Sequence, residues 1–393
     1  MKHILASLFL AASLRAAPLK VFILAGQSNM QGHAKISTVE HIGMDPATKP
    51  LLDAMTDADG KPKVCERVWI SSIGCAGDDK TEQTGKLTAG FGATKEKIGP
   101  EFTFGLTMEK LTGAPILLIK TSWGGKSLNT DFRPPSAGSY VFNDTQLAQF
   151  EKQEKDIAKI KAEKIAATGF YYRLMIEHVK KVLGDLKRVV PGYDASQGYE
   201  LAGFAWFQGW NDMVDQGTYP TRDKPGGYDA YSTALAHFIR DVRKDLNTPK
   251  LPFVIGVMGV GGPTSEYGPT EQRYKATHDH FRDAMAAPAD LPEFKGNVTA
   301  IRTEQYWDRE LKLARTKENE TKEKAKKLAK EQKLKPAEER ALTEKMRAES
   351  LTERDRLILE KGVSNAEFHY LGSAKILGGI GKGLAEALAE LRR

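Results

Sequence analysis

The chain has 393 residues, of which 40% are hydrophobic and 28% are charged, and this composition is that of an ordinary globular protein. It excludes wholesale disorder, a collagen-like repeat and a disulfide-dense mini-protein. Because no apolar stretch of about 18 residues follows the N-terminus, a multi-span membrane protein is excluded as well. The net charge of +7 is concentrated in residues 309–361, which carry +5, and in residues 1–17, which carry +2. The rest of the chain is neutral, so we expect no nucleic-acid partner.

Residues 1–17 (MKHILASLFLAASLRAA) have the pattern of a secretory signal peptide. A short polar start is followed by an apolar run that is too short for stable membrane insertion, and then by small residues. Arg15 leaves the cleavage position open. The pattern predicts a secreted or periplasmic protein, and the alternative is a buried N-terminal helix.

Near-continuous apolar runs, bounded by turn residues, recur along the chain at 20–25, 67–72, 115–121, 200–208, 252–258 and 297–303. Such runs are typical of strands buried on both faces, as in a parallel sheet covered by helices. Helical periodicity lies between them, at 101–112, 147–187, 228–246, 271–287 and 373–392. The alternation predicts a doubly wound α/β fold, a three-layer α/β/α sandwich around a central parallel sheet.

Residues 309–361 have a different composition, dominated by Lys, Glu, Ala, Leu and Arg, with Pro336 near the middle. Their sparse apolar positions predict two charged helices that meet at Lys335–Pro336. We interpret the segment as a solvated helical hairpin inserted into the main domain. A nucleic-acid-binding arm is the alternative, and the interleaving of acids with bases disfavours it.

The chain has two cysteines, Cys65 and Cys75. In an exported protein they could form a disulfide, or both could be free and buried, and the sequence leaves the two possibilities open. We expect no metal site, because there is no further cysteine and His33 and His41 form no recognisable ligand cluster.

Four motifs follow predicted strands or precede the last helix: GQSNM at 26–30, SWGGKS at 122–127, QGWND at 208–212 and EFH at 367–369. Together they offer a serine hydroxyl, accessible glycine N–H groups, a side-chain amide and a histidine, the groups that acyl transfer requires. Taken singly, each motif could be a helix cap, a turn or a surface residue. Four strand-end motifs in this order favour the functional interpretation.

The order GQSNM, SWGG, QGWND and EFH resembles the SGNH hydrolase superfamily, and within it the sialate O-acetylesterase-type branch that includes carbohydrate acetylesterases and acetylxylan esterases. The resemblance spans roughly residues 20–308 and 362–393, with 309–361 as an insertion. It implies one flavodoxin-like α/β/α esterase domain over residues 18–393, with no cofactor and no metal.

The resemblance also implies the site residues. Ser28 would be the nucleophile and His369 the base. The oxyanion hole would take the backbone N–H of Ser28, a glycine N–H and a side-chain amide. The glycine would be Gly124 or Gly125, and the amide Asn211 in the first place and Gln208 in the second.

The triad acid departs from the superfamily pattern, which has Asp three residues before His where this chain has Ala366. Glu367 is the nearest carboxylate, and we expect it to orient His369. Asp212 or Asp308 could take this role, or the site could be a Ser–His dyad in which a carbonyl orients the imidazole. We expect His369 to ionise near neutrality.

The resulting hypothesis is an exported serine esterase that removes O-acetyl groups from a carbohydrate, a sialate or a polysaccharide, through an acyl-enzyme. One alternative is a catalytically weak or inactive glycan-binding protein that keeps the fold, and another is a lipase-like or thioesterase member of the superfamily. Tryptophans in the strand-end segments suit sugar rings or belong to the core: Trp123, Trp206, Trp210 and Trp307. A sialate carboxylate would require a basic contact, for which the chain offers Lys126, Arg133 and Arg273.

Overall fold

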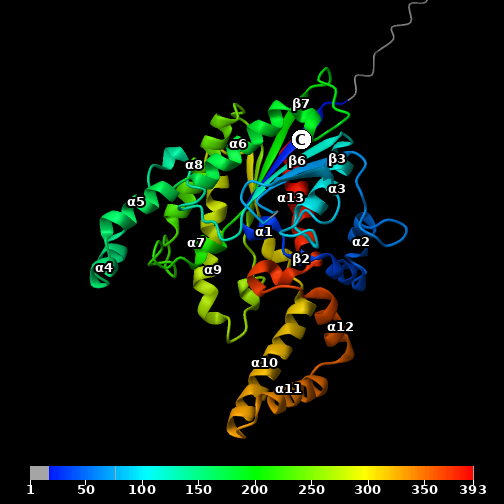
Figure 1. Ribbon diagram of the computed structural model, residues 1–393, viewed down its shortest axis with the longest axis vertical. Helices are drawn as coiled ribbons and strands as arrows, with labels where there is room; N and C mark the ends of the chain where they lie inside the picture. Colours follow the sequence, from blue (N-terminus) through cyan, green and yellow to red (C-terminus); the bar gives the residue numbers. More distant parts are fainter. Residues whose placement is uncertain (1–16, 76, 393) are drawn as a thin grey trace, which may run out of the picture.

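The computed structural model describes residues 17–75 and 77–392, and its centre is a twisted sheet (Figure 1). In this part of the chain the sheet has seven strands in the order β4-β3-β6-β1-β7-β8-β9. Their bounds in that order are Glu82–Lys86, Val68–Ile73, Ile116–Ser122, Leu19–Gly26, Tyr199–Phe207, Phe253–Val257 and Val298–Arg302. All neighbouring strands are parallel except β4, which pairs antiparallel with β3. The predicted parallel sheet is confirmed, and β4 is an added edge strand.

Helices cover both faces of the sheet, which confirms the three-layer sandwich. Phe22 of β1 packs edge-on against Phe104 of α3, with ring centroids 5.7 Å apart. On the opposite face Phe204 and Trp206 of β7 pack against Phe238 of α8. The helices of this main body are α1 (Ser28–Gln31), α2 (Lys49–Met55), α3 (Glu101–Thr112), α4 (Asp144–Lys152), α5 (Ile157–Ala167), α6 (Phe170–Gly184), α7 (Trp210–Val214), α8 (Asp229–Asp245), α9 (Lys275–Ala286) and α13 (Ala374–Glu390).

The periodic stretch 147–187 does not form one helix, because it is divided among α4, α5 and α6. Gly169, directly before α6, has φ +70°, and a Cβ there would lie 2.8 Å from the carbonyl oxygen of Arg133. This left-handed turn stops the helical run, and only glycine fits it without strain.

The carboxyl ends of three central strands lie side by side. Gly26 at the end of β1 pairs with Ser122 of β6 on one side and with Phe207 of β7 on the other. A Cβ on Gly26 would lie 2.1 Å from the Phe207 carbonyl oxygen, so this close approach requires glycine. The register therefore brings the GQSNM, SWGG and QGWND segments to one edge of the sheet, where open α/β sheets bind ligands.

The structure decides the state of the two cysteines. Cys65 and Cys75 are both free and buried, so they form no disulfide. The predicted signal peptide lies outside the described residues except for Ala17. Within the described residues, no helix combines the length and apolar character needed to span a membrane.

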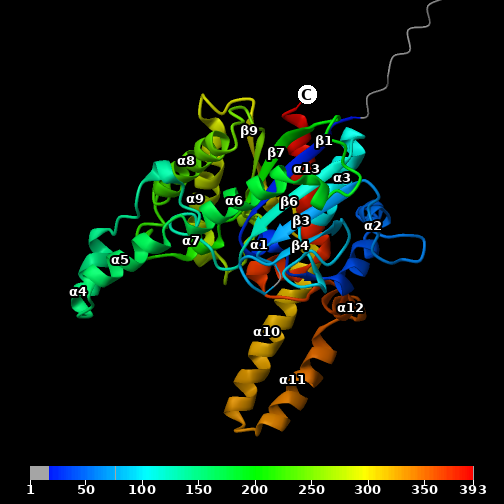
Figure 2. The ribbon, with the colours of Figure 1, turned by 45° about the horizontal axis from the view of Figure 1, so that its top comes forward.

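The charged insertion forms three helices where two were predicted: α10 (Arg309–Glu331), α11 (Pro336–Ser350) and α12 (Glu353–Gly362). The break at Lys335–Pro336 lies where the sequence places it. Figure 2 shows α10 and α11 projecting together away from the sheet. We call these three helices the arm.

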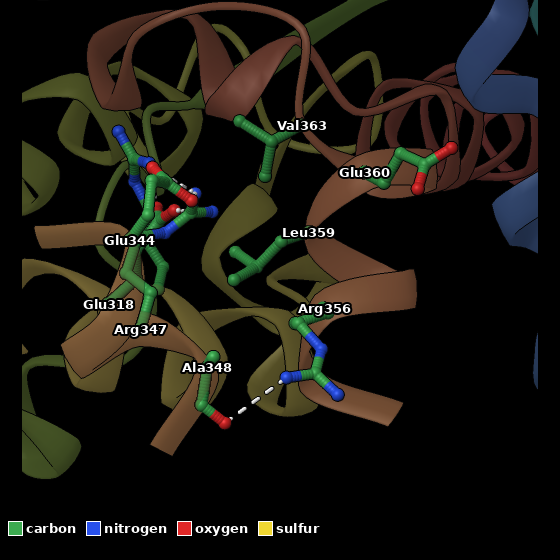
Figure 3. Close-up of a pocket in the computed structure, with 9 residues that line it drawn as sticks. Glu318, Glu344, Arg347, Ala348, Arg356, Leu359, Glu360 and Val363 are labelled. Carbon is green, nitrogen blue, oxygen red and sulfur yellow. Dashed lines mark hydrogen bonds and ion pairs between the residues drawn. The ribbon is translucent and has the colours of Figure 1, made fainter. Parts of the chain in front are cut away.

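The base of the arm is buried in the main core, whereas its tip buries only small side chains, Ala325 and Ala329, outside that core. Leu311 and Ile358 are fully buried in the main hydrophobic core, whereas α11 buries no residue. Glu318 of α10 accepts hydrogen bonds from Arg315 of the same helix at 2.6 Å and from Arg347 of α11 at 2.7 Å. Figure 3 shows Glu318 and Arg347 on one side of a hollow of about 540 Å³ in this region, with Leu359 nearby. Ion pairs therefore hold the middle of the arm, and apolar packing holds its base.

Replacing the tip, residues 323–343, by a short Gly/Ser linker is expected to leave the melting temperature and the activity close to those of the wild type. The excised residues contribute nothing to the main core, and the cut keeps the Glu318–Arg347 pair. Circular dichroism and an esterase assay measure the outcome.

Two single variants of α10 provide the matched comparison. Leu311→Ala removes a fully buried side chain and should cost about 2–5 kcal/mol of unfolding free energy. Leu313→Ala, two residues away and 63% exposed, should be nearly neutral. Equal effects of the two variants would contradict the proposed burial of the base.

Candidate active site

Ser28 stands at the turn from β1 into α1, at the carboxyl edge of the sheet. The side chain of Gln27 caps the helix by accepting a hydrogen bond from the Asn29 N–H at 3.1 Å. Gln27 and Asn29 are buried, and Ser28 between them is partly exposed. Its hydroxyl donates to Gln27 Oε1. The turn thus presents one serine hydroxyl, at a helix N-terminus, to the solvent side of the sheet edge.

His369 lies in the short helix η8 (Glu367–Gly372), which packs against α1 although it is far from it in the sequence. His369 Nδ1 lies 3.0 Å from Asn365 Oδ1. The same oxygen accepts the Ala366 N–H at 2.7 Å, which fixes the orientation of the amide. Because this oxygen can only accept, Nδ1 carries the proton and Nε2 is left free to act as a base.

Asn365 therefore stands where a triad acid would stand. Glu367, the predicted acid, is exposed and lines a neighbouring pocket beside Phe368, and within the described residues its carboxylate makes no hydrogen bond or ion pair. Asn365 was not among the residues predicted from the sequence, and it directly precedes Ala366, the position where the superfamily has Asp. Its signal in the sequence was only a polar side chain four residues before the base.

The two other carboxylates considered for this role have different partners. Asp308 caps α10 by accepting the Leu311 N–H at 3.0 Å, and it pairs with Lys375 at 2.9 Å. Asp212 is fully buried and accepts the N–H groups of Leu128 at 2.7 Å and Asn129 at 2.9 Å. The arrangement is that of the dyad alternative, in which the orienting carbonyl belongs to the Asn365 side chain.

The ring of His33 stacks on the ring of His369, with centroids 4.0 Å apart and planes within 3°. Burial, with the nearby charges of Lys97, lowers the pKa of His369 to about 4. Burial, His369, Lys97 and Lys120 lower the pKa of His33 to about 3. The expectation that His369 ionises near neutrality is therefore wrong, because its surroundings disfavour the imidazolium. In the sequence, His33 stood out only as a possible metal ligand.

Gly124 lies beside Ser28. A Cβ on Gly124 would be 4.0 Å from Ser28 Cβ and 3.1 Å from Gln31 Oε1, and the residue is exposed. Gly125 has φ +74°, and nothing lies within 4 Å of where its Cβ would be. The loop after β6 thus brings bare backbone next to Ser28, which is the arrangement an oxyanion hole requires.

The two predicted amide donors differ in availability. Gln208 is buried, and its Nε2 donates to the Lys126 carbonyl at 3.1 Å and to Asp212 at 2.6 Å. Both of its N–H bonds are therefore used. Asn211 is partly exposed, and its amide makes no hydrogen bond within the described part of the chain. Asn211 is the amide that has a proton to donate, and Gln208 supports the loop.

A pocket of about 600 Å³ is lined by Trp210 and Phe368, the sequence neighbours of Asn211 and His369. Aromatic side chains therefore form part of its wall. Trp210 and Phe368 lie with ring centroids 5.6 Å apart. Arg222 and Arg273 also line it, and neither has an ion pair within the described residues. Arg222 donates to the carbonyls of Met213 and Val214, which holds its guanidinium in place.

The other side chains considered for sugar binding are placed differently. Trp123 and Trp206 are core residues, 1% and 0% exposed, and Trp307 is buried as well. Lys126 lies over the ring of Tyr171 at 4.2 Å, and Arg133 donates to the carbonyl of Gly138 at 2.7 Å. Within the described residues, no three His, Cys, Asp or Glu side chains gather as a metal ion would require.

The orienting residue can be tested by a pair of variants. Asn365→Ala should lower kcat by about 10- to 100-fold, because the His369 tautomer is no longer fixed, while complete loss of a triad acid costs about 10⁴-fold. Glu367→Gln should remain close to the wild type. Steady-state kinetics on an aryl acetate compare the two variants, and the reverse order would restore Glu367 as the acid.

A profile of the carbohydrate esterase, sialic acid-specific acetylesterase family matches residues 18–292 of the chain, well over half of its length. The matched segment includes Ser28, Gly124 and Asn211, and it ends before the arm and His369. No curated protein matches the chain significantly.

Distant likenesses to solved structures accompany this match. A protein from Arabidopsis thaliana is 16% identical with a TM-score of 0.39, over 73% of this chain and 86% of that chain. A carbohydrate acetylesterase from Xanthomonas citri is 14% identical with a TM-score of 0.38, over 72% and 49% of the respective chains. NanS is 12% identical with a TM-score of 0.40, over 74% and 79%.

Proposed function

The chain belongs to the carbohydrate esterase family of sialic acid-specific acetylesterases, and from this premise we propose that it removes O-acetyl groups from a carbohydrate through an acyl-enzyme on Ser28. The family assigns the chain to the carboxylic ester hydrolases. The observation that carries the proposal is the hydrogen bond between His369 and Asn365, because it leaves Nε2 of a histidine next to α1 free to accept a proton.

In the first half of the reaction, the Ser28 hydroxyl turns from Gln27 toward His369 and attacks the acetyl carbonyl carbon. Its proton passes to His369 Nε2. The carbonyl oxygen becomes negative and accepts hydrogen bonds from the backbone N–H groups of Ser28 and Gly124 and from the side-chain amide of Asn211. The tetrahedral intermediate then expels the sugar oxygen, which takes the proton from His369.

In the second half, water attacks the acetyl-serine while His369 accepts a proton from it. The second tetrahedral intermediate collapses, the proton returns to Ser28 Oγ, and acetate leaves. Asp212 takes no part in proton transfer in this scheme. It holds the loop of Leu128 against the Asn211 segment, so that both sides of the oxyanion hole stay in place.

The sugar ring binds on Trp210 and Phe368, since aromatic faces pack well against the apolar faces of pyranose rings. Arg222 and Arg273 suit the carboxylate of a sialic acid, because a guanidinium binds a carboxylate through paired hydrogen bonds. An acetylated neutral polysaccharide would use the aromatic wall without the arginines.

A catalytically weak glycan-binding protein is the second candidate, and the replacement of the triad acid by an amide favours it. An amide orients His369 but does not neutralise the imidazolium that forms during attack. Export to the periplasm or the medium is proposed from the pattern of residues 1–17, and fractionation of producing cells tests it.

Ser28→Ala is expected to abolish acetate release and to leave the fold intact, because it removes only the attacking oxygen. A fluorophosphonate should label the wild type and should not label this variant. Ser196→Ala, on an exposed loop, serves as the matched control. Retention of more than about a hundredth of the activity would exclude an acyl-enzyme on Ser28.

Arg222→Gln and Arg273→Gln should raise KM for an O-acetylated sialic acid by about 10-fold or more, the effect of losing a charge-assisted hydrogen bond. Hydrolysis of p-nitrophenyl acetate and of acetylated xylan should be unchanged, because neither carries a carboxylate. Equal losses of activity on all three substrates would show that the two arginines do not bind a substrate carboxylate.

A further inference from the structure

His33 is placed next to the catalytic base by a small piece of structure outside the main sheet. It follows Gly32, whose φ is +90°, and precedes β2 (Ala34–Lys35). This strand pairs antiparallel with β5 (Lys97–Ile98) in a separate two-stranded sheet. The pairing sets Lys35 opposite Lys97, and the Lys97 ammonium lies 3.3 Å from His33 Nδ1.

The segment that carries His369 is tied to the same strand. Ser364 Oγ accepts the Lys35 N–H at 3.0 Å and donates to the Gly372 carbonyl at 2.7 Å. One hydroxyl thus bridges β2 and the two ends of the loop around η8. The parallel stacking of the His33 and His369 rings follows from backbone segments that are fastened to each other, so it is more than a chance contact of two mobile side chains.

We infer that His33 is a positioning residue for the catalytic base: its ring, anchored by Lys97, fixes the plane of the His369 imidazole. The inference rests on the proposed function of His369. Asn365 holds only one edge of that imidazole, through a single hydrogen bond to a neutral amide. A ring stacked on the face prevents rotation about that bond, and so supplies part of the orientation that a triad carboxylate gives in other hydrolases.

Burial, together with the charges around the stack, keeps both rings neutral. Lys97 from β5 and Lys120 from β6 face His33, and Lys97 also acts on His369. Because an ammonium can only donate, Lys97 requires His33 Nδ1 to be an acceptor, which puts the proton of His33 on Nε2. With a pKa of about 4, His369 stays in its base form under mildly acidic conditions, so kcat/KM of the wild type should begin to fall only near pH 4.

Two substitutions separate stacking from mere volume. His33→Phe keeps a flat ring on His369 and should retain most of kcat. His33→Ala uncovers the ring, and should lower kcat by about 10- to 100-fold with little change in KM, as expected for a misoriented base. Because water can then reach His369, the apparent pKa of the acid limb of kcat/KM in His33→Ala should also rise, toward the ordinary histidine value of about 6.5.

A substrate-free measurement keeps this inference distinct from the proposed function. The titration of His369, followed by NMR of its imidazole protons, should shift upward in His33→Ala and much less in His33→Phe. His280→Ala, on α9, is the control and should leave the titration unchanged. Unaltered titration and unaltered kcat in His33→Ala would overturn the inference. An active Ser28→Ala enzyme would instead overturn the proposed function.

Discussion

A buried ion pair between Lys120 and Glu101 joins the parts from which the site is built. Both side chains are fully buried, and the Lys120 ammonium donates to Glu101 at 2.7 Å, to the Gln31 carbonyl at 2.8 Å and to the Phe91 carbonyl at 2.7 Å. Its three N–H bonds thus have three acceptors, which is the condition for burying a charge without a large penalty. The pair fastens β6, the start of α3 and the end of α1 to one another.

The position of this pair explains how a short helix can hold Ser28, the proposed nucleophile, in a fixed place. Isolated from its surroundings, the single turn of α1 would not be stable. Its first residue, Ser28, is set by the end of β1, and the carbonyl of its last residue, Gln31, is held by Lys120. His33 lies only two residues after Gln31, so the contact of Lys120 with the Gln31 carbonyl also restricts the position of His33. Ser28 and the stacked His33 are therefore positioned by one buried network.

The site combines two kinds of positioning. Ser28, Gly124 and Asn211 follow parallel strands whose register aligns their carboxyl ends, and Asp212 locks two of the resulting loops together. His369 arrives from a loop that the sheet does not hold, and it depends on local partners: Asn365, His33 and the bridge made by Ser364. Asn365, the amide in place of the usual acid, is one of these local partners. The other local contacts of His369 can compensate for the weaker orientation that an amide gives.

The sequence alone predicts the parallel sheet, because strands buried on both faces are almost entirely apolar, as in β8 (FVIGV). It also located Ser28 at a strand end and the helix break at Pro336, since glycine and proline act through local backbone geometry. The edge strand β4 (EQTGK) gave no signal, because it buries too little. The folded structure was needed to show that Asn365 binds His369 and that His33 stacks on it. It was also needed to show that both N–H bonds of Gln208 are already used. These choices depend on the distances between side chains that packing brings together, and His33 and His369 are separated by more than three hundred residues of sequence.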